Sequence, residues 1–167
     1  MAVEIFTAWR PGLIGEIARA HSLYYAIHWN FGAFFEAKVA TDLSAFVRRF
    51  QPDRDRLFSA WSGETFLGSL VMDGSDPDNP AGQAHLRWFV MTDAARGQGI
   101  GARLMAEAMK FLAESGFSSC YLTTFRGLDT ARRLYERHGF VLVAEAEDST
   151  WGATVSEQRF ELHLKRS

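Results

Sequence analysis

The chain has 167 residues, 47% of them hydrophobic, which suits a single domain over residues 1–167 and is too short for two ordinary ones. The net charge is −2 and the basic residues are scattered, which argues against nucleic-acid binding. No apolar run approaches the roughly eighteen residues that span a bilayer. The lone Cys120 excludes an intrachain disulfide, and the N-terminus lacks a signal-peptide pattern. We therefore expect a cytoplasmic protein.

The first half of the chain predicts a strand, two helices and a hairpin. Residues 3–8 are typical of a strand, and Pro11 suits the first turn of the helix that follows, because its missing N–H has no partner there. Two stretches at helical spacing, separated by a break at 29–32, predict amphipathic helices. Strands at 56–61 and 65–72 form a hairpin. The two helical stripes consist of Ile14, Ile17, His21, Tyr24 and His28, then Phe35, Val39, Leu43, Phe46 and Phe50.

No metal site is expected in this half. The loop at 73–82 holds three aspartates, but their spacing is not that of a calcium loop, so we interpret it as a solvated turn. His21 and His28 lie on one helical face without a third ligand, which favours a packing or polar pocket role.

The second half alternates strands and helices. The run at 85–91 is apolar and aromatic, and after a glycine loop it is followed by a helix, with Gly116 where a C-cap is expected. A strand at 119–125 precedes a helix that Asp129 can cap and that ends near Gly139. Strands at 140–145 and 157–164 complete the chain, the last alternating Phe160, Leu162 and Leu164 inward with Arg159, Glu161 and His163 outward. This order predicts a mixed α/β sheet with helices on both faces.

The glycine loop Arg96–Gly101 lies between a strand and a helix, where backbone N–H groups and the helix N-terminus favour an anion. A P-loop is excluded because Lys and Ser/Thr are missing after Gly101. The dinucleotide pattern fits Gly97, Gly99 and Ala102, but the next strand ends without the acidic residue that binds a ribose. A turn without a ligand is the remaining alternative.

Read with its arginine, this loop has the pattern R-G-x-G-x-G, and residues 131–140 (ARRLYERHGF) match A-x-x-L-Y-x-x-x-G-F. This pair of motifs resembles the Gcn5-related N-acetyltransferase (GNAT) superfamily. The resemblance implies an α/β (α+β) fold with a mixed, mostly antiparallel sheet of about seven strands. It also implies acetyl-CoA as co-substrate. The chain departs from the pattern at Leu128, where many members carry an Asn that contacts the pantetheine arm.

The resemblance assigns roles to particular positions. The backbone of Phe89, Val90 and Met91 would pair with the pantetheine arm, and Tyr135 would be the general acid that protonates the departing thiolate. His85 lies where some members hold a carboxylate base. Glu145, Asp148, Glu36 and a water-relayed proton are the alternatives to His85. The pyrophosphate would bind to Arg96, Gly97, Gln98, Gly99, Ile100 and Gly101.

The acceptor is expected to be an amine of a small molecule or of an amino-acid-like compound, attacked directly in a ternary complex. The aromatic segment 27–36, together with Trp88 and Trp151, would line its pocket, with Glu36 and Arg87 as polar anchors, although core packing also accounts for such residues. Neither nucleic acid nor a membrane is expected as a partner, and a homodimer is left open.

A closer similarity is to acetyltransferase domains that in some bacteria are fused behind a MarR-type winged-helix domain. It is carried by residues 32–38 and 85–89, by Trp151-Gly152 and by residues 157–160. The alternative function is therefore a sensor or interaction module that binds acetyl-CoA without turnover. A dinucleotide-dependent oxidoreductase is a third alternative.

Overall fold

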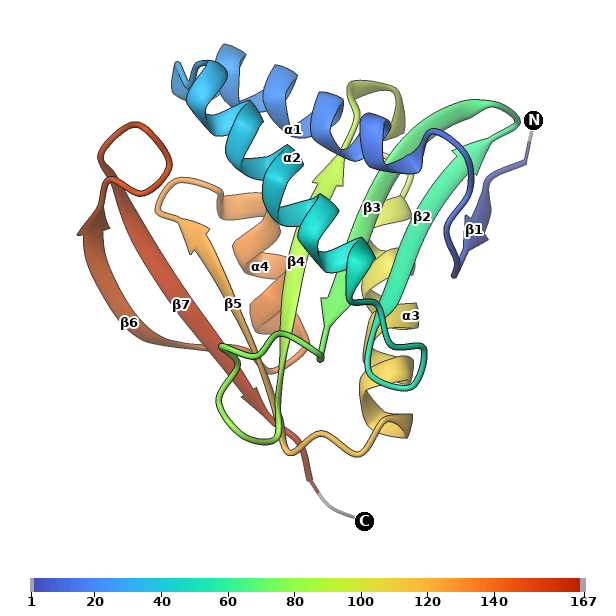
Figure 1. Ribbon diagram of the computed structural model, residues 1–167, viewed down its shortest axis with the longest axis vertical. Coiled ribbons are helices and arrows are strands. Elements are labelled where there is room, and N and C mark those ends of the chain that lie inside the picture. Colours follow the sequence, from blue (N-terminus) through green and yellow to red (C-terminus); the bar gives the residue numbers. More distant parts are fainter. Residues whose placement is uncertain (1, 166–167) are drawn as a thin grey trace.

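The computed structural model describes residues 2–165, which form one seven-stranded sheet covered on both faces (Figure 1). The strand order is β1-β2-β3-β4-β5-β7-β6, and every neighbouring pair is antiparallel except β4 and β5. The predicted fold class is confirmed. The strands are β1 (Glu4–Phe6), β2 (Arg56–Ser62), β3 (Thr65–Asp73), β4 (Gln83–Met91), β5 (Ser119–Phe125), β6 (Val141–Asp148) and β7 (Val155–His163).

Four α-helices cover the two faces of this sheet. Helices α1 (Leu13–Trp29) and α2 (Ala33–Arg48) lie across one face, and α3 (Ile100–Glu114) and α4 (Asp129–Arg137) lie behind the other (Figure 1). A short 3₁₀ helix, Asp93–Ala95, precedes the glycine loop. None of the helices in residues 2–165 is long and apolar enough to cross a bilayer.

Helical periodicity places the core side chains as predicted. Ile17 and Leu43 are fully buried beneath α1 and α2, and Leu104 and Leu112 are fully buried beneath α3. Phe160 on β7 is also fully buried, while Leu162 and Leu164 pack around the same core.

Several element boundaries differ from the prediction. Pro11 does not lie in the first turn of α1, because Gly12 takes the cap position with a left-handed backbone (φ 90°). Asp129 is the first residue of α4 rather than its cap, and the cap residue Leu128 offers no side-chain acceptor. Strand β6 runs to Asp148, three residues further than predicted. Gly116 follows the C-cap Ser115, a position where glycine is frequent.

A buried carboxylate joins the start of β2 to the end of β3. The Asp55 side chain is inaccessible to solvent and accepts hydrogen bonds from the backbone N–H groups of Gln51, Gly74 and Ser75 at 2.8–3.0 Å. The Ser75 hydroxyl donates a fourth hydrogen bond at 2.6 Å. These bonds hold the 73–82 loop against β2.

Replacing Asp55 by Ala should therefore destabilise the fold by about 3 kcal/mol, because several buried donors would lose their acceptor together. Urea unfolding measures this change, and Asp53→Ala, at an exposed position two residues away, is the control. A loss below about 1 kcal/mol in Asp55→Ala would contradict the structural role given to this carboxylate.

Candidate active site

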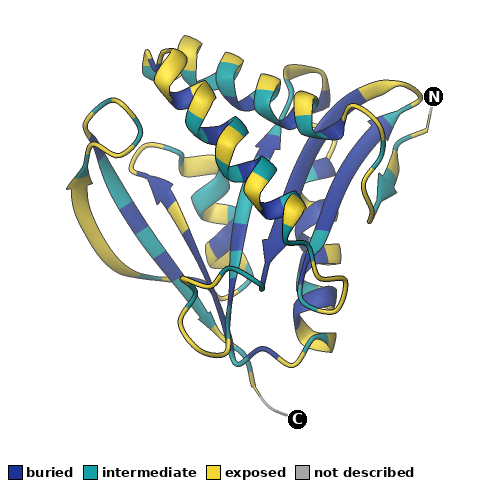
Figure 2. Cartoon of the chain, viewed as in Figure 1, coloured by how far each residue is buried: buried dark blue, intermediate teal, exposed yellow. Residues whose placement is uncertain are grey.

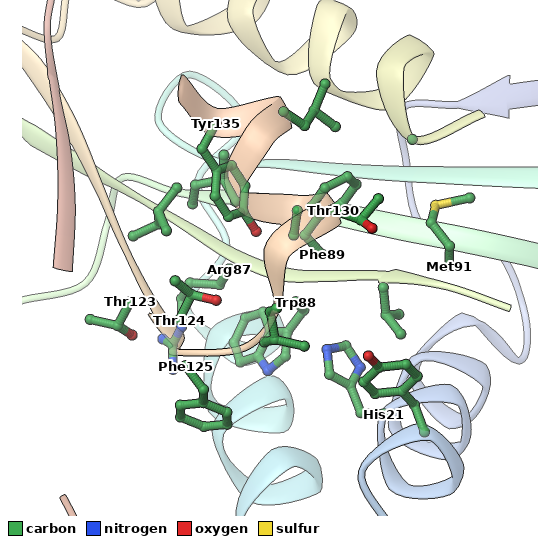
Figure 3. A pocket seen from close by; sticks show the side chains of 18 of the residues that line it. His21, Arg87, Trp88, Phe89, Met91, Thr123, Thr124, Phe125, Thr130 and Tyr135 are labelled. Atoms are coloured by element: carbon green, nitrogen blue, oxygen red, sulfur yellow. The ribbon is translucent and has the colours of Figure 1, made fainter. Parts of the chain in front are cut away.

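The central feature of the sheet is the separation of β4 from β5. The two strands pair in parallel at Gln83–Ser119, Ala84–Cys120 and His85–Tyr121, and no later pair is formed. Beyond His85 the strands diverge around a cleft of about 880 Å³ (Figure 3). The cleft is lined by β4, β5, the glycine loop and parts of all the α-helices.

A β-bulge in β4 determines what faces the cleft. Leu70 of β3 lies opposite both Trp88 and Phe89, because its neighbours pair with Val90 and Arg87. Trp88 has a left-handed backbone (φ 47°), which is strained for a bulky residue. The Ser69 hydroxyl donates a hydrogen bond of 2.8 Å to the Trp88 carbonyl.

The bulge turns two successive side chains of β4 to the same face. Arg87 approaches Asp42 of α2, and Trp88 packs on Phe46 of α2, with 5.7 Å between ring centroids. Phe89 lies on the other face, with its ring centroid 6.0 Å from that of Tyr135 on α4. The sheet thus presents Arg87 to one side of the cleft and Phe89 to the other.

The glycine loop has the backbone of an anion-binding turn. Gly97 and Gly99 both have left-handed backbones (φ 74° and 69°), and Gly99 is the cap of α3. An added Cβ at either glycine would meet no atom within 4 Å, so the space in front of them is open. No acidic side chain lies in the first turn of α3 and none caps it. Its first N–H groups are therefore suited to an external anion.

The structure brings most of the predicted cofactor positions to one cleft. Gln98 is the exception: its side chain donates a hydrogen bond of 2.6 Å to the Ala94 carbonyl on the exposed side of the loop. The predicted positions that line the cleft are Phe89, Val90, Met91, Arg96, Gly97, Gly99, Ile100 and Gly101.

Tyr135 also lines the cleft, and its side chain is buried. Its ring lies against Phe89, Phe140 and Phe160, and Figure 3 shows its hydroxyl pointing into the space between α4 and β4. Burial raises the pKa of Tyr135 above the usual value of a tyrosine. The hydroxyl is therefore neutral at physiological pH, and burial makes its proton harder to release than that of an exposed tyrosine.

His85 lies in the last pair of β4 and β5, where the cleft closes. Its ring stacks on Tyr121, with the ring centroids 4.3 Å apart. Burial lowers the pKa of His85 well below 6.5, and the positive charges of Arg87, Arg159 and Arg49 lower it further. A neutral imidazole of low basicity is a weak proton acceptor at pH 7.

The other proposed bases divide between the cleft and the surface. Glu36 is exposed and Glu145 pairs with Arg126 at 2.8 Å, and both lie outside the cleft lining. Glu36 therefore does not line the cleft in which it was expected to anchor an acceptor. Asp148 lines the cleft, and so does Glu157, which the sequence analysis did not single out.

Glu157 was missed because alternation along β7 assigned its face to solvent. That face is the one covered by α1 and α2, since Glu157 pairs with Phe125, which packs against Phe35 and its neighbours. The Trp151 indole donates a hydrogen bond of 3.1 Å to the Glu157 carboxylate. Burial raises the pKa of Glu157, and the neighbouring Asp148 raises it further.

Arg87 lines the cleft as predicted, but its charge is compensated. Its guanidinium approaches Asp73 at 3.1 Å, Asp76 at 3.6 Å and Asp42 at 3.8 Å. Asp73 is inaccessible to solvent and also accepts two hydrogen bonds, of 2.7 and 2.6 Å, from Arg49. These ion pairs hold Arg87 against the end of β3.

The two histidines of α1 have different environments. His21 is 7% exposed and lines the cleft, whereas His28 is exposed on the surface, with its ring tilted against that of Tyr24. The Nδ1 atom of His21 lies 2.8 Å from the Ile17 carbonyl, which can only accept, so the proton is on Nδ1. Burial lowers the pKa of His21 to about 4, so the ring is neutral and Nε2 is a free acceptor.

Comparison with known proteins identifies the family. The model of the acetyltransferase (GNAT) family matches residues 18–140, so the chain belongs to this family. No curated protein sequence gives a significant match.

Solved structures share the whole fold at low sequence identity. One is ribosomal-protein-alanine N-acetyltransferase from Brucella melitensis, with a TM-score of 0.76 and 14% identity over 96% of this chain and 99% of that one. Another is ribosomal-protein-S18-alanine N-acetyltransferase from Escherichia coli, with a TM-score of 0.69 and 15% identity over 99% and 96% of the two chains. A proposed acetyltransferase from Salmonella typhimurium, solved with its cofactor acetyl-CoA, has a TM-score of 0.74 and 15% identity over 100% and 96%.

The buried His21 predicts a pH-dependent stability. Its pKa is lowered to about 4 in the fold, against about 6.5 in the unfolded chain. The unfolded chain therefore binds the proton first as the pH falls, and stability is lost between these two values. Between pH 7 and pH 5, wild type should lose about 2 kcal/mol more than His21→Gln, as measured by urea unfolding.

The control for this experiment is His163→Gln, which removes an exposed imidazole from β7. Its loss of stability between the two pH values should match that of wild type. Equal losses in wild type and His21→Gln would show that His21 is not held neutral by its surroundings.

Proposed function

We propose that this protein transfers the acetyl group of acetyl-CoA to the amine of a small molecule or an amino-acid-like acceptor, by direct attack in a ternary complex. One observation carries the proposal. The separation of β4 from β5 opens a single cleft that holds the 89–91 strand segment, the glycine loop and Tyr135. A protein of the same fold, from Salmonella typhimurium, is solved with acetyl-CoA as its cofactor.

The cofactor would lie along β4 and end at the glycine loop. The pyrophosphate would accept hydrogen bonds from the N–H groups at the start of α3, where Gly97 and Gly99 leave open space. The pantetheine arm would follow the edge of β4 at 89–91, which has no partner on β5. Leu128 lines the cleft without a polar group to offer the arm.

The reaction requires bonds and protons to move in balance. The amine nitrogen forms a bond to the thioester carbon, and the bond from that carbon to sulfur breaks. An ammonium acceptor loses one proton before attack and a second as the amide forms. One of these two equivalents ends on the coenzyme A thiol and the other passes to solvent. Tyr135, neutral and buried, would supply the proton that the sulfur takes.

The proton acceptor is better assigned to a water relay than to His85 alone. The imidazole lies at the closed end of the cleft, where burial and three arginines keep it neutral. It can accept a hydrogen bond from the amine or from a water, but it does not retain a proton at pH 7. A relay through water needs only such weak acceptors.

An amine panel with acetyl-CoA tests the proposed reaction. Wild type should release free thiol only when an acceptor is present. Tyr135→Phe keeps the aromatic contacts and loses the hydroxyl, so turnover should fall by roughly 10²-fold while acetyl-CoA affinity changes little. Tight acetyl-CoA binding without turnover across the panel would instead indicate a sensor. Full turnover in Tyr135→Phe, where chemistry limits the rate, would remove Tyr135 as the acid.

The placement of the pyrophosphate is tested by a matched pair of glycines. Gly99→Ala should weaken acetyl-CoA binding about tenfold, or about 1.4 kcal/mol, because the methyl group enters the space meant for the ligand. Gly116→Ala is the control: Gly116 has the same left-handed backbone (φ 75°) and equally open surroundings, but follows the other end of α3. Equal affinities in calorimetry would contradict the placement.

A further inference from the structure

In the half of the cleft beneath α1 and α2, the cationic side chains have ion-pair partners and two carboxylates do not. Its cations are paired with carboxylates: Lys38, whose ammonium also lies 5.0 Å from the Trp151 ring centroid, is 2.9 Å from Asp42. Arg87 is held by Asp73, and Arg96, which lies over the Tyr24 ring, pairs with Asp93 at 3.2 Å. Its remaining anions, Asp148 and Glu157, have no ion-pair partner within residues 2–165. This part of the cleft therefore carries uncompensated negative charge.

The two carboxylates share one face of the sheet. Asp148 pairs with Val155, and Glu157 pairs with Ala146, so both side chains point to the α1/α2 side of the β6–β7 pair. They are close enough for Asp148 to raise the pKa of Glu157. The Trp151 indole N–H fixes the position of one Glu157 oxygen at 3.1 Å. Trp151 and a hydrogen bond between the two carboxyl groups orient the pair, and no cation within residues 2–165 forms an ion pair with it.

An aromatic wall continues from this pair toward α1. Trp151 lies against Phe35 and Phe125, with ring centroids 5.9 Å away in both cases. Phe125 in turn lies 5.8 Å from Tyr25 of α1. The apolar part of a ligand could pack against these rings.

His21 is a second, independent sign of what this half of the cleft accepts. Its Nε2 carries no proton and has no hydrogen-bond partner within residues 2–165, although the side chain is only 7% exposed. Figure 3 shows its ring turned from α1 toward β4. Among residues 2–165 the only buried side-chain nitrogen or oxygen without a hydrogen-bond partner is the Arg56 Nε, so the His21 Nε2 keeps contact with solvent and a ligand donor can reach it. Both ends of this aromatic wall therefore offer acceptors to a ligand with N–H donors.

Resting on the proposed acetyl transfer, we infer that the acceptor is a cationic amine with an apolar body and no carboxylate, and that Glu157, with Asp148, binds its ammonium group. A zwitterionic amino acid would place its carboxylate near these two anions, while Lys38 and Arg87 are already occupied by Asp42 and Asp73. A cationic amine that has no carboxylate meets no such repulsion.

The test measures acetyl transfer to matched pairs of acceptors: phenethylamine against phenylalanine, and cadaverine against lysine. Each amine differs from its partner by one carboxylate. Wild type should have a kcat/KM at least tenfold higher for the amines. If the amino acids are acetylated more efficiently, the inference is wrong while the proposed function stands. If no acceptor is acetylated although acetyl-CoA binds, both fail together.

Glu157→Gln keeps an oxygen to accept the Trp151 N–H and removes the charge. It should raise the KM for phenethylamine at least tenfold and leave the affinity for acetyl-CoA unchanged. Glu161→Gln is the matched control, because Glu161 lies on the same face of β7, four residues away, outside the cleft. An unchanged KM in folded Glu157→Gln would overturn the inference. If Glu157→Gln does not fold, Asp148→Asn decides by the same measurement.

Discussion

The site depends on one constraint in the sheet: β4 and β5 are hydrogen-bonded partners at three residues and then separate. Two features on β3 shape β4 beyond that point. Leu70 faces the bulge at Trp88, and Gly68 lies so close that an added Cβ would be 2.7 Å from the Val90 carbonyl. Across this bulge β4 stays paired with β3 as far as Met91, whereas it forms no pair with β5 beyond His85. The cleft thus results from the end of the backbone pairing between β4 and β5, and the side chains determine only what lines it.

The two faces of the sheet divide the chemistry between them. On the α3/α4 side, the helix N-terminus and the neutral Tyr135 suit an anionic cofactor and a departing thiolate. On the α1/α2 side, carboxylates and His21 offer hydrogen-bond acceptors beside aromatic rings. The bulge contributes to both sides, because Trp88 packs on the α1/α2 side and Phe89 packs on the α3/α4 side. A reaction between a thioester and an amine needs both environments within one cleft.

The sequence predicted what local patterns encode. Glycine spacing located the loop at 96–101, and helical periodicity placed Leu104 and Leu43 in the core. It could not predict the bulge, since a tryptophan carries no signal for a left-handed backbone. It also missed Glu157, because alternation along a strand separates two faces without telling which is solvated. The low basicity of His85 was equally hidden, since two of the arginines that lower its pKa, Arg49 and Arg159, are distant in the chain.

The last strand in the sheet order, β6, has a consequence for the behaviour of the protein in concentrated solution. It is an edge strand, exposed along most of its length (Figure 2), and both Val141 and Val143 are more than half exposed. Such an edge invites pairing with other chains. Three acidic residues occupy its last four positions, Glu145, Glu147 and Asp148, and charged side chains on an edge strand disfavour such pairing. The carboxylate that faces the cleft thus belongs to a run that also protects the molecule from aggregation.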